Sequence, residues 1–178
     1  MRTYAVLLRG VNVGGHRKVP MARLREALEA AGFDRVRTYI QSGNIVLDTE
    51  LDAGAAGKAV AAVILAEFGH TVPVMVRTGA DLDRVMGADP FAGRGLDESK
   101  VAVTFLSGPA PDLTVPAGQP EEAHVDGTEV WVYYPDGMGR STLERTGFWK
   151  PLGGLDATAR NLRTVRRLRD MAADDTRE

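Results

Sequence analysis

The sequence predicts an α+β protein that consists of two subdomains. Along the first 78 residues, stretches with strand-like and helix-like patterns follow one another in the order βαββαβ. The rest of the chain again combines a strand, a hairpin and helices, although less regularly. A chain of 178 residues can bury one large core or two small ones, and its 44% apolar and 26% charged content is ordinary for a globular protein.

The elements of the first subdomain follow from the spacing of their apolar residues. Met21, Leu24 and Leu28 recur at helical spacing, and Gly32 then marks the end of that helix. Two β-rich runs are joined at Ser42-Gly43, which is a typical hairpin signal. Across residues 1–78 we expect strands at 3–9, 35–40, 44–48 and 72–77, and helices at 20–31 and 55–68.

Elements in this order fold most simply as a ferredoxin-like subdomain, with two helices on one face of an antiparallel sheet. Successive strands then alternate in direction, so the loop after the first strand and the hairpin turn at 41–44 fall at the same edge of the sheet. The second helix also ends at that edge, which brings His70 there. We therefore expect the polar and cationic residues of these three segments to lie close together.

The second half is predicted to begin with a connecting helix and linker in residues 79–100, followed by a second α+β subdomain in residues 101–178. Ser141 and Glu144 have the spacing of a capping box that opens a short helix. The other expected elements are a strand at 101–106, an irregular proline-rich loop at 108–120, a hairpin at 122–134 that turns at Asp126-Gly127, and a C-terminal helix at 158–172. We interpret this subdomain as a degenerate copy of the ferredoxin-like first one.

Composition excludes several classes of protein. The chain has no cysteine, which rules out disulfides and thiolate chemistry. No stretch approaches the roughly 20 apolar residues that a membrane-spanning helix needs, and the start is better interpreted as a strand than as a signal peptide. We therefore expect a cytoplasmic protein without a membrane partner. The formal net charge is −2, with basic residues concentrated near the start, so nucleic acid could be bound only through a local patch.

The nine residues from Gly10 to Lys18 are the most informative part of the chain. Their three glycines allow backbone N–H groups to turn toward one point, Arg17 and Lys18 close the segment, and Arg9 precedes it. A helix that begins near Pro20 adds the positive end of its dipole. We expect the segment and the hairpin turn to bind a small phosphorylated ligand, with no cofactor. The predicted ligand-binding residues are Arg9, Asn12, Gly14, Gly15, Arg17, Lys18, Gln41, Ser42 and Asn44, with Arg140 placed to hold a second anion.

Several kinds of site do not fit the sequence. The glycine-rich segment has the GxxxxG spacing of a P-loop, but His16 and Arg17 stand where Lys and Ser or Thr are required, so an NTPase is rejected. The three histidines lie in separate segments without ligand spacing, so no metal site is expected. No serine stands in a G-x-S-x-G context, which argues against an α/β-hydrolase.

Three alternatives to ligand binding stay open. Arg160, Arg163 and Arg167 would share one face of the expected last helix, as in a module that follows the phosphates of RNA or single-stranded nucleic acid. An enzyme of acyl or phosphoryl transfer would use His16 or His70 as a base, although no nucleophile stands out. The third alternative is a protein-interaction domain whose loops only hold the two halves together.

The chain also resembles a bacterial family, domain of unknown function 1697. The resemblance rests on Leu8–Gly15, on Thr38–Asn44 and on a closing motif formed by Gly139-Arg140-Ser141 and Thr158–Val165, although the family commonly has Trp where this chain has Leu162. It implies an α+β fold of two ferredoxin-like halves and no particular activity. Because it joins the two ends of the chain, we expect Arg160 and Asn161 to complete a polar pocket with the first loop.

Overall fold

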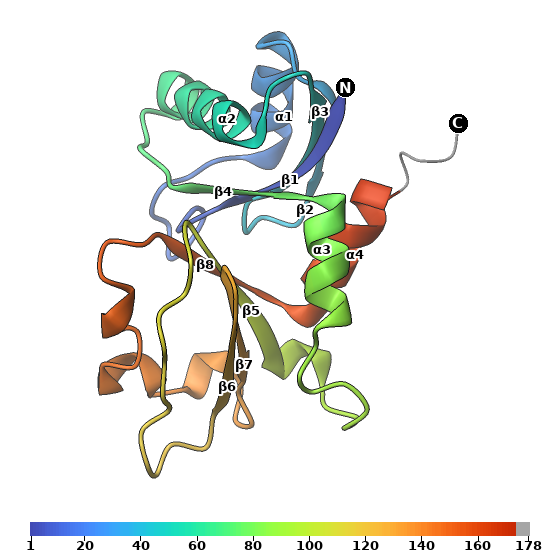
Figure 1. Cartoon of the computed structure of the whole chain (residues 1–178). Coiled ribbons are helices and arrows are strands. Elements are labelled where there is room, and N and C mark those ends of the chain that lie inside the picture. Colours follow the sequence, from blue (N-terminus) through green and yellow to red (C-terminus); the bar gives the residue numbers. More distant parts are fainter. Residues whose placement is uncertain (174–178) are drawn as a thin grey trace. The chain divides into compact units, whose positions relative to one another are not determined.

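The computed structural model describes residues 1–173, which contain two four-stranded antiparallel sheets and four α-helices (Figure 1). The α+β class predicted from the sequence is therefore confirmed. The chain divides into two compact units. The first is Met1–Asp83 together with residues 167–173, and the second is Arg84–Arg166.

The sheet of the first unit has the strand order β2-β3-β1-β4, and each neighbouring pair is antiparallel. The two helices at residues 21–30 and 53–68 cover one face of this sheet (Figure 1). Each element lies within a few residues of its predicted position. In chain order they are β1 (Arg2–Leu8), α1 (Met21–Ala30), β2 (Asp34–Tyr39), β3 (Asn44–Thr49), α2 (Ala53–Phe68) and β4 (Val74–Thr78).

Alternation along the strands builds the core of this unit. Tyr4, Val6 and Leu8 of β1 point to the helix-covered face, where they pack in one buried cluster with Leu24 of α1 and Ile64 of α2. The side chain of Asp52 accepts a hydrogen bond from the Ala55 amide (2.8 Å) and so caps the start of α2, and Gly69 ends that helix with a φ of 72°. Asp52 and Gly69 therefore set the first and last residues of α2, and the connection to β4 begins after Gly69.

The second unit has the strand order β6-β7-β5-β8, again antiparallel throughout. One face of this sheet is covered by an irregular segment whose Leu143 and Phe148 pack against Leu106, Val130 and Val132. Its strands are β5 (Val101–Leu106), β6 (Glu122–Asp126), β7 (Glu129–Tyr133) and β8 (Ala157–Asn161), and its short 3₁₀ helices are η1 (Glu98–Lys100), η2 (Met138–Arg140), η3 (Leu143–Thr146) and η4 (Lys150–Leu152). The helix α3 (Gly79–Gly87) contains the boundary between the units.

Two predictions in this half are wrong. The expected helix at 158–172 begins only with α4 (Leu162–Ala173), because the preceding residues form strand β8 beside β5. Asn161 Oδ1 accepts a hydrogen bond from the Thr164 amide (2.9 Å), which starts the helix there. The capping box is also absent: Ser141 Oγ accepts from the Leu143 amide (3.1 Å) and opens a 3₁₀ turn, without a reciprocal bond from Glu144.

Candidate functional site

The loop between β1 and α1 folds back on itself in a tight turn. Val13 and His16 form an isolated antiparallel bridge, in which the His16 amide donates to the Val13 carbonyl (2.9 Å). Gly14 and Gly15 between them have φ values of 57° and 78°. Two successive positive φ values are typical of a type I′ turn, which explains the choice of glycine. Neither glycine amide donates a hydrogen bond to any acceptor in the described part of the chain.

Asn12 ties this loop to the hairpin turn between β2 and β3. Its Nδ2 group donates to the Val19 carbonyl (2.9 Å) and to the Gln41 carbonyl (2.7 Å), and its Oδ1 atom accepts from the Val19 amide (2.8 Å). Both N–H donors of the side chain are therefore used inside the protein. Asn12 positions the loop and has no donor left for a ligand.

The hairpin turn lies against the end of β1. The Leu8 amide donates to the Gly43 carbonyl (2.9 Å), and a Cβ atom on Gly43 would lie only 2.7 Å from Leu8 Cβ. The Arg9 amide donates to the Pro73 carbonyl (3.0 Å), which brings the segment after α2 to the same place. The loop, the turn and the connection to β4 therefore share one edge of the sheet, as strand direction predicts.

Asn44 was expected to contact a ligand, but its side chain is fully buried. Its Nδ2 group donates to the Tyr39 carbonyl (3.0 Å) and to Ser42 Oγ (2.8 Å) within the hairpin turn. The amide thus closes the turn, as Asn12 closes the preceding loop. Of the predicted turn residues, Gln41 and Ser42 are exposed.

Three cationic side chains lie on this edge, and all are exposed: Arg9, Arg17 and Lys18. The Arg17 guanidinium folds back over Gly10, so a Cβ atom there would lie 3.7 Å from Nη1. Arg17 and Lys18 form no ion pair with any residue in 1–173. Exposed cations beside exposed backbone amides that have no acceptor among the described residues are the two components of an anion site.

The remaining predicted site residues belong to the second unit. Arg140 is exposed at the end of η2. Arg160 lies in β8 and is only 7% exposed, and its Nη1 group donates to Thr158 Oγ1 (2.7 Å) and to the Ala159 carbonyl (2.9 Å). Burial lowers the pKa of the Arg160 guanidinium to about 10. Asn161 is occupied as the cap of α4.

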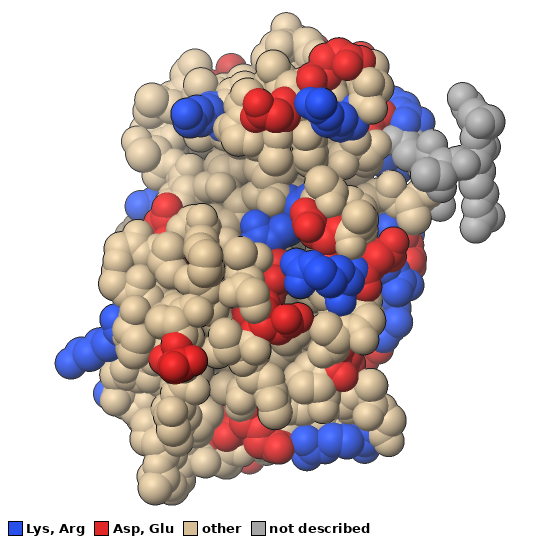
Figure 2. Space-filling view, viewed as in Figure 1, with Lys and Arg blue, Asp and Glu red and all other residues tan. Residues whose placement is uncertain are grey.

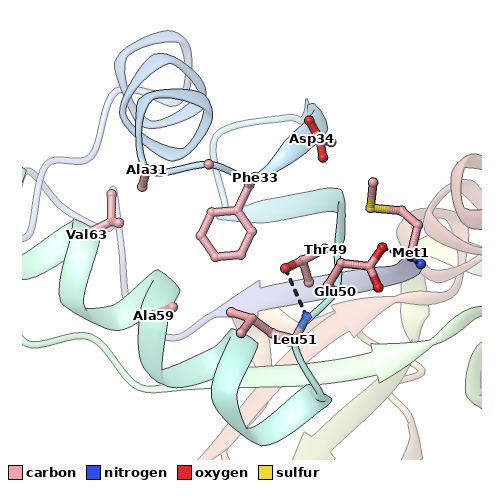
Figure 3. Close-up of a pocket in the computed structure, with 10 residues that line it drawn as sticks. Met1, Ala31, Phe33, Asp34, Thr49, Glu50, Leu51, Ala59 and Val63 are labelled. Atoms are coloured by element: carbon pink, nitrogen blue, oxygen red, sulfur yellow. Dashed lines mark hydrogen bonds and ion pairs between the residues drawn. The ribbon is translucent and has the colours of Figure 1, made fainter.

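A pocket of about 360 Å³ opens at the other edge of the first sheet, where β1 begins (Figure 3). Phe33, Leu51 and Val63 form apolar walls, and Glu50 on its rim pairs with the Met1 amine at 2.7 Å. That amine lowers the pKa of the Glu50 carboxyl, mainly through the hydrogen bond. None of the predicted ligand-binding residues lines this pocket.

Of the three arginines expected to share one helix face, Arg160 lies outside the helix in β8, whereas Arg163 and Arg167 are both exposed on α4. Two other arginines of this helix are paired, Arg166 with Glu98 (2.6 Å) and Arg169 with Asp170 (3.1 Å). Within residues 1–173, no cluster of His, Asp or Glu side chains could hold a metal ion. No helix in the same range is both long enough and apolar enough to cross a bilayer.

Sequence reasoning missed a polar pocket of about 260 Å³ in the second unit. Ser141 was interpreted only as a helix cap, and Tyr134 only as the end of a hairpin. Gly137 and Gly139 lie close together just before Ser141. These two glycines are the local sequence signal that could have indicated the pocket. The lining residues are Tyr134, Met138, Gly139, Ser141, Glu144 and Arg145.

Comparison with known proteins identifies the family of this chain and a solved structure with a similar fold. No curated protein sequence matches the chain. A solved structure of a conserved bacterial protein from Streptococcus pneumoniae is similar, with a TM-score of 0.72 and 21% sequence identity, over 97% of this chain and 99% of that one. At this identity the likeness concerns the fold alone. The family model described as a protein of unknown function (DUF1697) matches residues 1–131, so the chain belongs to that family.

Proposed function

We propose that the loop between β1 and α1 binds a small anionic ligand, with a phosphate group as the preferred anion. The backbone amides of Gly14 and Gly15 would donate to the anion, and Arg9, Arg17 and Lys18 would neutralise it. Gln41 and Ser42, on the adjoining turn, would contact the rest of the ligand. Asn12 and Asn44 hold the two segments in place instead of contacting the ligand.

One observation carries this proposal. The two amides at the tip of the Gly14–Gly15 turn make no hydrogen bond within residues 1–173, and the nearby Arg17 and Lys18 have no acidic partner there. Fixed donors lose little entropy when an anion binds, and cations that are not already paired do not have to break an ion pair first. A rigid turn with these properties is suited to an oxyanion of modest size.

We also propose that the first unit has a ferredoxin-like fold. The strand order β2-β3-β1-β4, with both helices on one face, supports it for the first unit. In the second unit, an irregular segment with short 3₁₀ helices covers the corresponding face, so its relation to the first is more remote. The contributions predicted for Arg140, Arg160 and Asn161 stay predictions.

Nucleic-acid binding through the last helix receives less support. Arg160 is buried in a strand, so only Arg163 and Arg167 of the expected three lie exposed on α4, and two other arginines of that helix form ion pairs. On the face that Figure 2 shows, Lys and Arg side chains are interspersed with Asp and Glu, so no field of a single sign covers it. A protein that follows phosphates through several contacts needs such a field.

An amide chemical-shift titration tests the proposal. Inorganic phosphate, adenosine monophosphate and glucose 6-phosphate are added to the full chain at up to millimolar concentration. We expect at least one of them to shift the Gly14 and Gly15 amides in a saturable way. The double variant R17Q/K18Q should weaken that binding by about tenfold or more, because charge-assisted hydrogen bonds are lost.

The matched control is R25Q/K58Q, which removes two exposed cations from α1 and α2 and leaves the same net charge as the test variant. It should bind the phosphate compounds like the original chain. Equal weakening in both variants would show that binding depends on overall charge and not on this loop. If none of the three compounds moves the glycine amides, the loop is not an anion site of this kind.

A further inference from the structure

The polar pocket of the second unit is a cavity of about 260 Å³ at the end of the β6–β7 hairpin, where η2 and η3 begin. Its wall carries a phenol, a hydroxyl, a carboxylate and a guanidinium, from Tyr134, Ser141, Glu144 and Arg145. A Cβ atom on Gly139 would meet nothing within 4 Å, so the backbone there leaves open space. Met138 on the rim is 41% exposed, which is high for a large apolar side chain.

Tyr134 lines this cavity and carries a polar group that the protein does not use. The residue is only 6% exposed, since its ring packs in the buried cluster with Leu143 and Phe148. Its hydroxyl nevertheless forms no hydrogen bond with any residue from 1 to 173. Burial, with added repulsion from Glu144 and Glu121, raises the pKa of Tyr134 to about 12, so the phenol stays protonated at neutral pH. The hydroxyl is not among the buried unpartnered polar atoms of the described residues, so it can be reached by a ligand in the cavity.

Two carboxylates make the surroundings of this phenol negative. Glu121 is 7% exposed; its Oε1 atom accepts from Ser141 Oγ (2.5 Å), while its Oε2 atom is buried and has no hydrogen-bond partner among the described residues. Glu144 lies on the cavity wall. No Lys or Arg within residues 1–173 forms an ion pair with either carboxylate. A buried carboxylate without a counter-charge favours the approach of a cation.

Arg145 adds the opposite charge to the same wall. It is exposed, and it makes no ion pair with a described residue. The cavity wall therefore offers negative charge from Glu144, positive charge from Arg145 and a hydroxyl group from Tyr134, and Glu121 adds negative charge behind Ser141. A ligand with a single charge would match only half of these groups.

We propose that this cavity binds a small zwitterion of the α-amino acid class. The ammonium group of the ligand lies toward Glu144, the Ser141–Glu121 pair and the phenol oxygen of Tyr134, and its carboxylate pairs with Arg145. An apolar ligand side chain would rest against the exposed Met138. A cavity of this volume can hold one amino acid, and the proposal is independent of the anion site in the first unit.

Three related probes test this proposal on the full chain: L-leucine, isoamylamine, which lacks the carboxylate, and 4-methylpentanoate, which lacks the amine. Amide chemical shifts of Gly139 and Leu143 report on the pocket. We expect saturable shifts with leucine and an affinity at least tenfold higher than that of either fragment. A fragment that binds as tightly as leucine would overturn the proposal, as would no shift with leucine at tens of millimolar.

Substitutions of single side chains then test which groups of the cavity contact leucine. Tyr134→Phe should weaken leucine binding about three- to tenfold, the usual effect of one lost hydrogen bond, without lowering thermal stability. Tyr133→Phe is the matched control, since this neighbouring phenol packs beside Phe91 on the other face of the hairpin and should leave binding unchanged. Glu144→Gln should weaken leucine but not 4-methylpentanoate. If leucine binds to Tyr134→Phe as it does to the original chain, the assignment is wrong.

Discussion

At the scale of single residues, Gly43 is the position where the architecture depends most directly on the absence of a side chain. A Cβ atom there would lie 2.7 Å from Leu8 Cβ and 2.8 Å from Val11 Cγ2, and the φ of the residue is 90°. We expect Gly43→Ala to lower the free energy of unfolding by about 2–5 kcal/mol, from backbone strain and overpacking together. Urea denaturation measures the change.

Gly118 provides an unusually close control for that variant. Its φ is 89°, almost that of Gly43, but a Cβ atom there would meet nothing within 4 Å. Gly118→Ala should therefore show the strain alone, about 1–2 kcal/mol. Equal losses in the two variants would mean that the approach of the hairpin turn to β1 does not limit stability.

For Asn12 and Asn44, the sequence predicts the location of the side chain but not its role. The sequence places both among glycines and cations, and the prediction that they lie at one edge of the sheet agrees with the hydrogen bond from Asn12 to the Gln41 carbonyl. Their role was not predictable, because an amide serves equally well as a ligand contact or as a backbone tie. Only coordinates show that the Asn12 donors are already used and that Asn44 is fully buried.

At the scale of elements, η1 begins with a capping interaction that depends on pH. Asp97 Oδ1 accepts from the Ser99 hydroxyl (2.7 Å) and from the Ser99 amide (2.9 Å). These bonds, the hydroxyl first, lower the pKa of the Asp97 carboxyl. The stabilisation is therefore present above the pKa of the unfolded chain and is lost as pH falls through the lowered value of the folded protein.

Ser99→Ala should raise the pKa of Asp97 toward its ordinary value. The shift should be incomplete, because the backbone amide of residue 99 can still donate. A carboxyl-detected NMR titration measures the midpoint directly. Ser107→Ala is the control, since Ser107 bonds to the Asp156 amide and not to Asp97. An unchanged midpoint in Ser99→Ala would contradict the assigned cause.

Strand β8 shows why one element escaped prediction. Its buried positions are Thr158 and Arg160, while Ala157, Ala159 and Asn161 are half-buried. A strand is normally recognised by apolar residues at every second position, and here the inward positions are polar or charged. In the first unit the inward positions are apolar, as along β1, and each predicted element appears there. In the second sheet β5 and β7 also bury apolar residues, and both were predicted, so the difference lies in the side chains of β8 itself.

At the scale of the whole molecule, residues 167–173 belong to the first unit, although they follow the second in sequence. Leu168 in that segment is fully buried, and so is Leu106 in β5 of the second unit at 1% exposure. Truncating either side chain should cost about 2–5 kcal/mol through the cavity that remains. The two variants should differ in which of the two sheets unfolds locally and exposes its amides to solvent.

Native-state hydrogen exchange can locate that opening, because it follows each amide separately. We expect Leu168→Ala to speed exchange mainly in β1 and β3, since Leu168 belongs to the unit of the first sheet, and Leu106→Ala to speed it mainly in β5 and β7, since Leu106 belongs to the buried cluster of the second sheet. Leu106→Ala serves as the control for Leu168→Ala, because both remove the same atoms. If both variants accelerate exchange equally in the two sheets, the protein unfolds as one cooperative body and the division into two units has no energetic meaning.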